Sequence, residues 1–256
     1  MRAAEGAPRP GPPGPFRRAP PARYYAGSVS QAPAPPTRDA ADRPGLFLTF
    51  EGGDGVGKTT QTRILAEALR AEGVEVLVTR EPGGTDLGAE IRRLLLDGDH
   101  IDPRAEALLY AADRAHHVAT LVRPALERGA VVVSDRYLDS SVAYQGAARS
   151  LGAEEVRGLS LWATGGLLPD RTILLDADPA LADRRTNGRG GRDRFERESD
   201  AFRAALREQF LALADAEPGR IVVVDAAQPI EAVTAAVRRA LDPLLDARSG
   251  PGGQGA

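Results

Sequence analysis

Hydrophobic positions between Gly45 and Ala247 follow two alternating patterns. Apolar residues recur at the spacing of an amphipathic helix over Lys58–Ala71 and, as one long helix, over Ala105–Arg128. Short continuous runs rich in aliphatic and β-branched residues predict buried strands at Leu46–Phe50, Val74–Val78, Val131–Val133, Thr172–Leu175 and Ile221–Val224. Such runs are typical of parallel strands covered on both faces. The pattern therefore predicts an α/β fold with three layers, a five-stranded parallel sheet with helices on both faces. We expect Trp162 in its core.

Two terminal segments fall outside this pattern. Residues 1–44 hold 11 of the 20 prolines and carry a net charge of +4. Residues 248–256 are rich in glycine. Because such sequences offer few bulky apolar residues to offset the loss of chain entropy, we expect both segments to be disordered. The tail 1–44 is then an inert extension or a weak tether for a partner or nucleic acid, and residues 45–247 form the folded domain.

The composition excludes several classes of function. The chain has no cysteine and three histidines, which excludes a disulfide scaffold and a cysteine nucleophile and disfavours zinc chemistry. A net charge of −3 provides no basic face for duplex nucleic acid. No apolar run approaches the roughly 18 residues of a membrane helix. We therefore expect a cytoplasmic protein that binds neither nucleic acid nor membrane.

A phosphate-binding motif follows the first predicted strand. Gly52–Thr59 fits the pattern G-x-x-x-x-G-K-[ST] between a strand and a helix, the context that separates this P-loop motif from an ordinary glycine-rich turn. Its glycines let backbone N–H groups surround phosphate oxygens at the positive end of a helix. Lys58 is the only lysine among 33 basic residues, which indicates that a compact ammonium is needed beside the β- and γ-phosphates. The expected ATP-binding residues are Gly52, Gly53, Asp54, Gly55, Val56, Gly57, Lys58, Thr59 and Thr60.

Two oxygen-bearing side chains suit a magnesium ion bound together with ATP. The Thr59 hydroxyl of the motif can ligate Mg²⁺. Asp135 ends the strand that begins at Val131, and in P-loop proteins such an aspartate holds Mg²⁺ directly or through water. A strand-end aspartate alone is weak evidence, but the motif upstream strengthens it.

Arginines at the same sheet edge favour a kinase over a nucleotide-driven switch. Arg80 and Arg136 follow the second and third predicted strands, and a guanidinium matches phosphate with two parallel hydrogen bonds. The segment Arg184–Arg194 is rich in arginine and glycine, which indicates a mobile cationic lid or a solvated basic loop. A guanine-nucleotide switch usually carries an N-K-x-D motif, which the single lysine excludes.

Five ordered segments resemble the bacterial thymidylate kinases of the nucleoside-monophosphate kinase group. They are Phe50–Thr60, Thr79–Thr85, Tyr110–Arg114, Asp135–Gly146 and Ala163–Asp170. The resemblance covers about residues 46–245. It implies transfer of the γ-phosphoryl group of ATP to dTMP, giving dTDP and ADP, with Mg²⁺ as cofactor and a homodimer as the usual assembly. A P-loop kinase for another nucleoside monophosphate is the alternative, and a switch protein remains a distant third.

The resemblance implies which residues act on the phosphates. Arg80 and Arg136 would hold the dTMP phosphate, and the lid arginines Arg189 and Arg192 would clamp the transferring group. The P-loop has Gly55 and Val56 where another subtype has an arginine, so the catalytic cation would come from the lid. The expected catalytic residues are Lys58, Arg136, Arg189 and Arg192, and the expected metal-site residues are Thr59, Asp54 and Asp135.

The resemblance also implies a nucleoside pocket. Asp54 would contact the sugar 3′-hydroxyl, Arg114 the thymine edge, and Tyr144 the space at the sugar 2′ position, favouring deoxyribose. Tyr110 would stack on the base, although many relatives have Phe there. Each of these side chains could instead serve packing or a local ion pair. His116 and His117 we expect to be surface or core residues rather than catalysts. The complete substrate set is Asp54, Arg80, Tyr110, Arg114, Arg136, Ser141, Tyr144 and Gln145.

Overall fold

Five parallel strands form a sheet in the computed structural model, which describes residues 45–97, 101–149, 151–186 and 199–249. These residues all belong to one of the two units into which the chain divides, Pro36–Ala256. The strands are β1 (Leu46–Glu51), β2 (Val76–Arg80), β3 (Val131–Asp135), β4 (Arg171–Asp176) and β5 (Ile221–Asp225), in the order β2-β3-β1-β4-β5. Every neighbouring pair is parallel, which confirms the predicted sheet.

Four predicted strands lie within the observed ones, but β2 begins two residues later than expected. The N–H groups of Gly73 and Val74 donate to the carbonyls of Arg70 and Leu69, each at 3.0 Å, so these residues still close the preceding helix. Pairing with β3 begins only at Val76. As a result Arg80 is the last residue of the strand itself.

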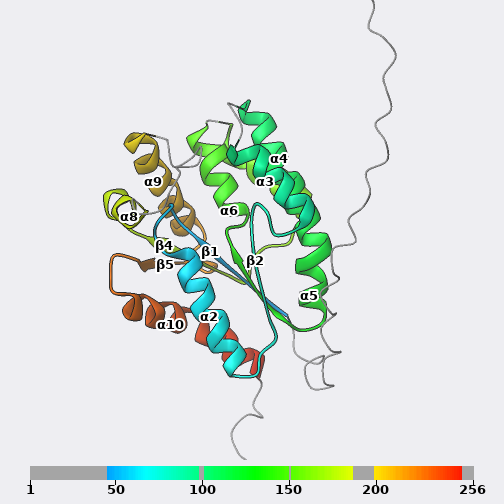
Figure 1. Cartoon of the computed structure of the whole chain (residues 1–256), viewed down its shortest axis with the longest axis vertical. Helices are drawn as coiled ribbons and strands as arrows, with labels where there is room; N and C mark the ends of the chain where they lie inside the picture. The colour runs from blue at the N-terminus through cyan, green and yellow to red at the C-terminus, as the bar shows by residue number, and fades with distance from the viewer. Residues whose placement is uncertain (1–44, 98–100, 150, 187–198, 250–256) are drawn as a thin grey trace, which may run out of the picture. The chain divides into compact units, whose positions relative to one another are not determined.

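The chain adds strands first beyond one edge of β1 and then beyond its other edge. From β1 it passes to β2 and β3 on one side, and then to β4 and β5 on the other. In open parallel sheets, ligands bind beside such a switch point at the carboxyl ends of the strands. Charged residues end every strand at that edge: Glu51, Arg80, Asp135, Asp176 and Asp225. The segment that follows β1 therefore lies where the topology favours a ligand site (Figure 1).

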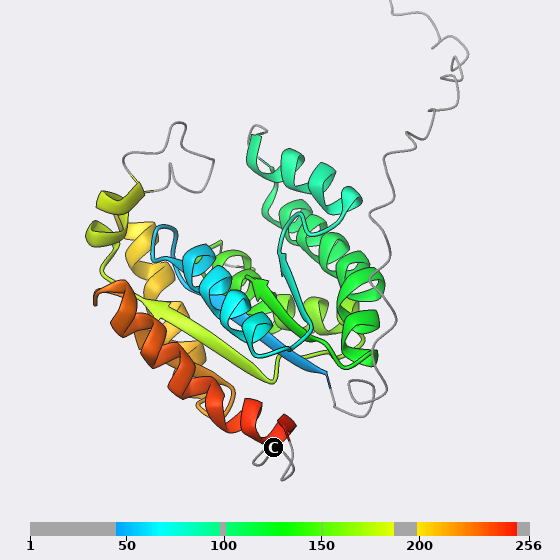
Figure 2. The same cartoon turned by 60° about the horizontal axis from the view of Figure 1, so that its bottom comes forward.

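Helices cover both faces of the sheet, which confirms the three-layer prediction. They are α2 (Lys58–Ala71), α3 (Asp86–Asp97), α4 (Pro103–His117), η1 (Val118–Val122), α5 (Arg123–Glu127), α6 (Leu138–Ser141), η2 (Val142–Ala148), α7 (Ala153–Thr164), α8 (Pro179–Thr186), α9 (Asp200–Ala216) and α10 (Ile230–Ser249). Figures 1 and 2 show α2 and α10 on one face, and α4, α5 and α9 on the other. Among the described helices, none is long and apolar enough to cross a membrane.

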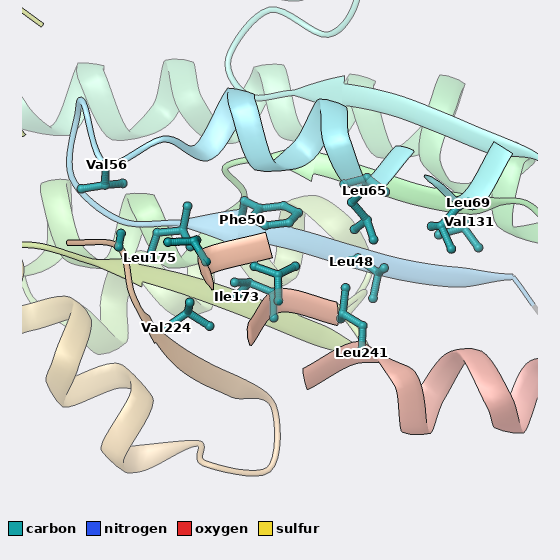
Figure 3. Packing of buried hydrophobic residues seen from close by; sticks show 14 of the residues in the cluster. Leu48, Phe50, Val56, Leu65, Leu69, Val131, Ile173, Leu175, Val224 and Leu241 are labelled. Atoms are coloured by element: carbon teal, nitrogen blue, oxygen red, sulfur yellow. The ribbon is translucent and has the colours of Figure 1, made fainter. Parts of the chain in front are cut away.

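Side chains of β1 alternate between the two faces, as the two-residue period of a strand requires. Leu48 and Phe50 are fully buried against α2 and α10 (Figure 3). Phe47 packs on the opposite face against Val118 and Val122. Full burial of each such side chain contributes about 1.5–3 kcal/mol. The strand that precedes the P-loop is therefore anchored from both sides.

The long helix expected over Ala105–Arg128 forms, but with an interruption. The turn Val118–Val122 is a π-helix, and the Arg123 N–H donates back five residues to the carbonyl of Val118. Pro124, the second residue after this turn, has no N–H to donate and cannot continue a regular α-helical hydrogen-bond ladder. The wider turn absorbs the proline without ending the helix.

The expectation for Trp162 is wrong: its side chain is 80% exposed. The inward face of α7 is formed by Val156, Ser160 and Thr164. A helix turns about 100° per residue, so a side chain two positions from Ser160 points to the opposite side. Hydrophobicity alone did not indicate which face Trp162 occupies.

Several predicted segments lie partly or wholly outside the described residues. Residues 1–44, 187–198 and 250–256 lie outside them. At the C-terminal end, α10 continues to Ser249, two residues beyond the expected end of the domain at residue 247. Similarly, α8 continues to Thr186, so Arg184 and Arg185 are helical rather than part of a loop as expected. The disorder predicted for residues 248–249 and the loop predicted for residues 184–186 are therefore wrong.

Candidate active site

Backbone conformation at three glycines shapes the loop between β1 and α2. Gly52, Gly55 and Gly57 have φ angles of 128°, 77° and 102°, which residues with a Cβ rarely adopt. A Cβ at Gly52 would also collide with the carbonyl oxygen of Leu175. The loop leads into α2, whose first turn has no side-chain cap. The N–H groups of that turn are thus available to an anion, as the motif predicts.

Lys58 lies inside the loop that it would serve. Its Nζ donates to the carbonyls of Gly53 at 2.6 Å and Gly52 at 3.0 Å, and its side chain is 7% exposed. Burial and the nearby charge of Arg136 lower the pKa of Lys58 from 10.5 to about 8, against the opposing effect of carboxylates such as Asp54. The ammonium is therefore largely buried within the loop, in the wall of the larger pocket.

Thr59 and Asp135 lie together at the foot of the loop. The Thr59 hydroxyl donates to Oδ2 of Asp135 at 2.6 Å. The two are brought together because β1 and β3 pair in register, with Phe50 opposite Asp135. A hydroxyl beside a carboxylate is a hard-oxygen pair suited to Mg²⁺, which keeps several waters and phosphate oxygens in its shell. Among the described residues, no three His, Cys, Asp or Glu side chains gather as a metal site.

Arg136 occupies the centre of the site in a left-handed backbone conformation, with φ of 71°. Its Nη1 donates to Ser140 Oγ at 2.9 Å and to the Gly52 carbonyl at 3.1 Å. Its Nη2 lies 2.5 Å from Oδ1 of Asp54. A non-glycine residue at positive φ is uncommon and concentrates at functional sites. The strained backbone aims this guanidinium at the loop rather than along the strand.

Asp54 and Tyr144 complete this cluster. The Tyr144 hydroxyl lies 3.3 Å from Oδ2 of Asp54 and 3.3 Å from Nη2 of Arg136. Desolvation would raise the pKa of Asp54, but the positive charges of Arg136 and Lys58 outweigh it and lower that pKa below its ordinary value. Asp54 is therefore a carboxylate at neutral pH, and Arg136 is its counter-ion.

Two pockets meet at this cluster. The larger one follows the P-loop and the strand ends, and its lining includes Arg80 and Asp135. The smaller one extends toward α4 and η2 and is lined by seven of the eight predicted substrate residues, all except Arg80: Asp54, Tyr110, Arg114, Arg136, Ser141, Tyr144 and Gln145. Both pockets share Asp54, Glu81, Arg92 and Arg136. Groups bound in the two pockets would approach one another between Asp54 and Arg136.

Buried polar groups and aromatic rings line the smaller pocket. Gln145 is 1% exposed, and its Nε2 donates to Oε1 of Glu106 at 2.7 Å. Tyr144 packs against Phe210, with 6.3 Å between ring centroids. Tyr110 is half-buried at the pocket wall. These contacts fix the polar atoms in a largely apolar wall, the usual composition of a site for a heterocyclic ring.

Sequence reasoning missed the far end of the larger pocket. That end is formed by Arg185 of α8 and by the segment after β5, including Gln228, Pro229 and Ile230. The Nη1 atom of Arg185 donates to the carbonyl of Ala226 at 2.8 Å. Parallel strands place their carboxyl ends at the same edge of the sheet, where ligands bind. The loop after β5 could therefore have been expected on the same edge as the P-loop. Arg189 and Arg192 lie outside the described residues, so their placement stays a prediction.

Buried acids near the site were also missed. Glu51, the last residue of β1, accepts hydrogen bonds from the N–H groups of Tyr137 and Ser140 and from the Ser140 hydroxyl, at 2.8, 3.2 and 2.5 Å. Burial and the charge of Asp139 raise the pKa of Glu51 to about 7. The Ser140 hydroxyl also accepts a hydrogen bond from Arg136. Glu51 therefore helps to fix the position of the central guanidinium through Ser140. A glutamate in an otherwise apolar strand was the signal for such a role.

Comparison with known proteins agrees with this geometry. Residues 50–237 match the family described as thymidylate kinase. The chain is 60% identical over 205 residues to a thymidylate kinase of Clavibacter michiganensis subsp. michiganensis, covering 79% of this chain and 97% of that protein. It is 63% identical over 204 residues to one of Leifsonia xyli subsp. xyli, covering 78% and 96%. It is 48% identical over 202 residues to one of Methylococcus capsulatus, covering 79% and 97%.

These matches span the P-loop, the central cluster and both pockets. They agree with the fold that the strand order established and with the resemblance carried by the five segments. The chain belongs to the thymidylate kinase family.

Proposed function

We propose that this chain performs the reaction of its family at the junction of the two pockets. It is a dTMP kinase, which transfers the γ-phosphoryl group of ATP to dTMP and gives dTDP and ADP. The observation that supports the placement is the pair of pockets sharing Asp54 and Arg136. One pocket contains the P-loop for the donor, and the other is lined by seven of the eight residues expected to contact dTMP.

The donor would occupy the larger pocket. The glycine loop and the uncapped first turn of α2 would receive the phosphates of ATP, with Lys58 moving from the carbonyls of Gly52 and Gly53 to the phosphate oxygens. The adenine would lie toward Arg185 and Ile230, at the far end of this pocket. Thr59 and Asp135 would hold Mg²⁺, with Asp54 at its outer shell. Bound there, the ion would offset the charge of the phosphates.

The acceptor would occupy the smaller pocket. Arg136, which lines both pockets, would hold the phosphate of dTMP at their junction, and Arg80, which lines the larger pocket, would reach it from the donor side. Tyr110 and Arg114 would contact the base, and Tyr144 would face the 2′ position of the sugar. The remaining predicted lining residues are Ser141 and Gln145.

The chemical difficulty is the approach of two anions, because the acceptor is already a phosphate and needs no strong base. Two unit charges 4 Å apart at an effective dielectric constant of 20 repel by about 4 kcal/mol. The positive charges of Lys58 and Arg136 would offset this repulsion, and those of Arg189 and Arg192 in the lid would offset it further. Positioning and charge neutralisation account for most of phosphoryl-transfer catalysis.

A homodimer would cover the most exposed apolar side chains. Trp162 on α7 is 80% exposed and Leu108 on α4 is 58% exposed, and these two helices contact one another. Contiguous exposed apolar patches mark interaction surfaces, and contact between α4 and α7 is compatible with one patch that includes both side chains. We propose that a second copy of the chain packs there. We also propose a cytoplasmic location, where ATP is available as co-substrate.

A coupled ADP-release assay with a panel of monophosphates tests the proposed substrate. We expect ATP consumption to depend on the acceptor and to be fastest with dTMP. Faster turnover with another nucleoside monophosphate would reassign the substrate. ATP consumption that ignores the acceptor would remove the kinase assignment itself.

A further inference from the structure

A chain of short hydrogen bonds joins the end of β2 to the base end of the smaller pocket. Thr79 Oγ1 lies 2.6 Å from Nε2 of His117. Nδ1 of the same ring lies 2.7 Å from Oε1 of Glu81. The other carboxylate oxygen, Oε2, accepts from Nε of Arg114 at 2.7 Å. The connection thus runs from the neighbour of Arg80 to the guanidinium of the base pocket.

Burial makes each link in this chain hard to replace. The exposed fraction is 0% for His117, 3% for Glu81 and 1% for Arg114. Loss of one partner at such positions leaves a buried charge or donor unsatisfied, which is costly. Each oxygen of Glu81 has one partner, one from the imidazole and one from the guanidinium. The carboxylate therefore fixes the imidazole of His117 and the guanidinium of Arg114 relative to each other.

The hydrogen bonds of Arg114 leave few N–H groups for a ligand. Nη1 donates to Ser160 Oγ at 3.0 Å, and Nη2 donates to the Tyr137 carbonyl at 3.2 Å and to Ser141 Oγ at 3.1 Å. With the bond to Glu81, described residues use four of its five N–H donors. The fifth N–H group, on Nη1, remains for a hydrogen-bond acceptor of the ligand. The direction in which it points depends on the orientation of the guanidinium plane.

Histidine suits this position because its neutral ring offers both kinds of hydrogen-bonding atom. With the proton on Nδ1, it donates to Glu81, and Nε2 accepts from the Thr79 hydroxyl. The loop after β2 closes over this pair at Gly84, where a Cβ would collide with both Thr79 and His117. His117 itself lines neither pocket.

We propose that His117 is a positioning residue for nucleobase recognition, acting through the Glu81 carboxylate to fix the plane of Arg114. This inference rests on the proposed function, in which the smaller pocket holds dTMP. Because His117 does not contact the substrate pocket, its effect reaches the base only through the carboxylate. The route predicts that the Nδ1 contact matters for dTMP binding and that the Nε2 contact matters less.

Two amide variants separate these contacts. H117N places an amide nitrogen near the position of Nδ1 and keeps a donor for Glu81. H117Q places its amide near Nε2 and loses that donor. His116, the adjacent half-buried residue on the same helix, provides the matched control H116N. The measurements are KM for dTMP, KM for ATP and kcat by coupled assay, the Kd for dTMP by calorimetric titration, and Tm.

We expect H117Q to raise both KM and Kd for dTMP by about tenfold or more, the loss expected for a hydrogen bond to a charged group. Its KM for ATP should stay within about twofold of the wild-type value. H117N should restore dTMP binding to within about threefold of the wild-type value, and H116N should leave it unchanged.

Unchanged dTMP affinity in H117Q, with only Tm lowered, would show that His117 is a packing residue and would overturn the proposal. Equal losses of dTMP affinity in H117Q and H117N would overturn the route through Glu81. If the His117 variants do not fold, E81Q tests the carboxylate link itself: dTMP binding that is unchanged in E81Q overturns the proposal, because the route from His117 to Arg114 runs through Glu81.

The wild-type enzyme keeps this test separate from the proposed function. If wild-type protein shows no turnover that depends on dTMP, the proposed function fails. If the wild-type enzyme is active on dTMP and H117Q equals it in dTMP affinity, only the positioning role fails.

Discussion

The Nζ atom of Lys58 lies 2.6 Å from the carbonyl oxygen of Gly53, inside the loop that precedes it. The chain's single lysine is thus hydrogen-bonded to backbone oxygens at the N-terminus of α2. Phosphate oxygens can replace those carbonyl oxygens without moving the ammonium into water. This arrangement makes Lys58 the group whose removal should most affect the donor site.

The K58A and K58R variants test that role. We expect each to lower kcat by about 100-fold or more, because alanine removes the charge and a planar guanidinium cannot replace a compact ammonium beside the phosphates. The far-UV circular dichroism spectrum should not change. The coupled assay measures kcat, and R93A, which removes an exposed arginine of α3, serves as control. A K58A enzyme with near-normal turnover would refute the assignment of the donor site.

The raised pKa of Glu51 predicts a dependence of stability on pH. The folded state holds a proton on Glu51 up to about pH 7, whereas the unfolded chain releases it near pH 4.5. The free energy of unfolding should therefore fall as pH rises from about 4.5 through 7, by at most about 3 kcal/mol from this group. In E51Q this contribution is missing.

Urea denaturation at a series of pH values measures this effect. The E51Q variant should lose less stability than the wild-type protein between pH 5 and about 7.5. E67Q, which changes an exposed glutamate of α2, should keep the wild-type slope. Identical slopes in wild-type protein and E51Q would show that Glu51 is ionised throughout.

The bulk and the hydroxyl of Tyr144 should have separable effects. Y144F keeps the ring that packs against Phe210, so we expect it to keep the preference for dTMP over its ribonucleotide counterpart. Y144A opens the space at the 2′ position and should reduce that preference by about tenfold or more. The ratio of kcat/KM for the two substrates is the measurement. An unchanged ratio in Y144A would remove the steric explanation.

The exposed face at Trp162 should determine the assembly. W162E places a charge where we propose that a second copy packs, and it should shift the protein from dimer to monomer in light scattering with size-exclusion chromatography. A247E, at an exposed position of α10, provides a surface control. A wild-type protein that is monomeric at micromolar concentration would contradict the proposed homodimer.

The strands and the P-loop were predictable because their signals are local. Gly52–Thr59 needed only a strand before it and a helix after it, and the apolar run of β1 predicted that strand within one residue. The register of β1 with β3 then brought Asp135 to Thr59, as the topology of such sheets requires. The predicted nucleoside pocket came from the family resemblance, since its residues lie on separate helices.

Other features depend on contacts between distant residues and left no local signal. The bond between His117 and Glu81 spans 36 positions, and neither residue type alone indicates a buried partner. The exposure of Trp162 depends on which face of α7 packs inward. The hydrophobicity pattern could not show this, because Trp162 is a large aromatic residue that lies on the exposed face. The π-helical turn at Val118–Val122 follows from Pro124, whose effect on the helix could have been anticipated.

The most direct test of the central idea follows the phosphorus atom itself. ATP labelled at the γ-phosphorus is mixed with dTMP and the wild-type enzyme, and the products are separated. Transfer across the junction at Asp54 and Arg136 predicts that the label appears in dTDP in proportion to the ADP formed. Label found only in inorganic phosphate, or ATP left intact in the presence of dTMP, would contradict the proposed transfer.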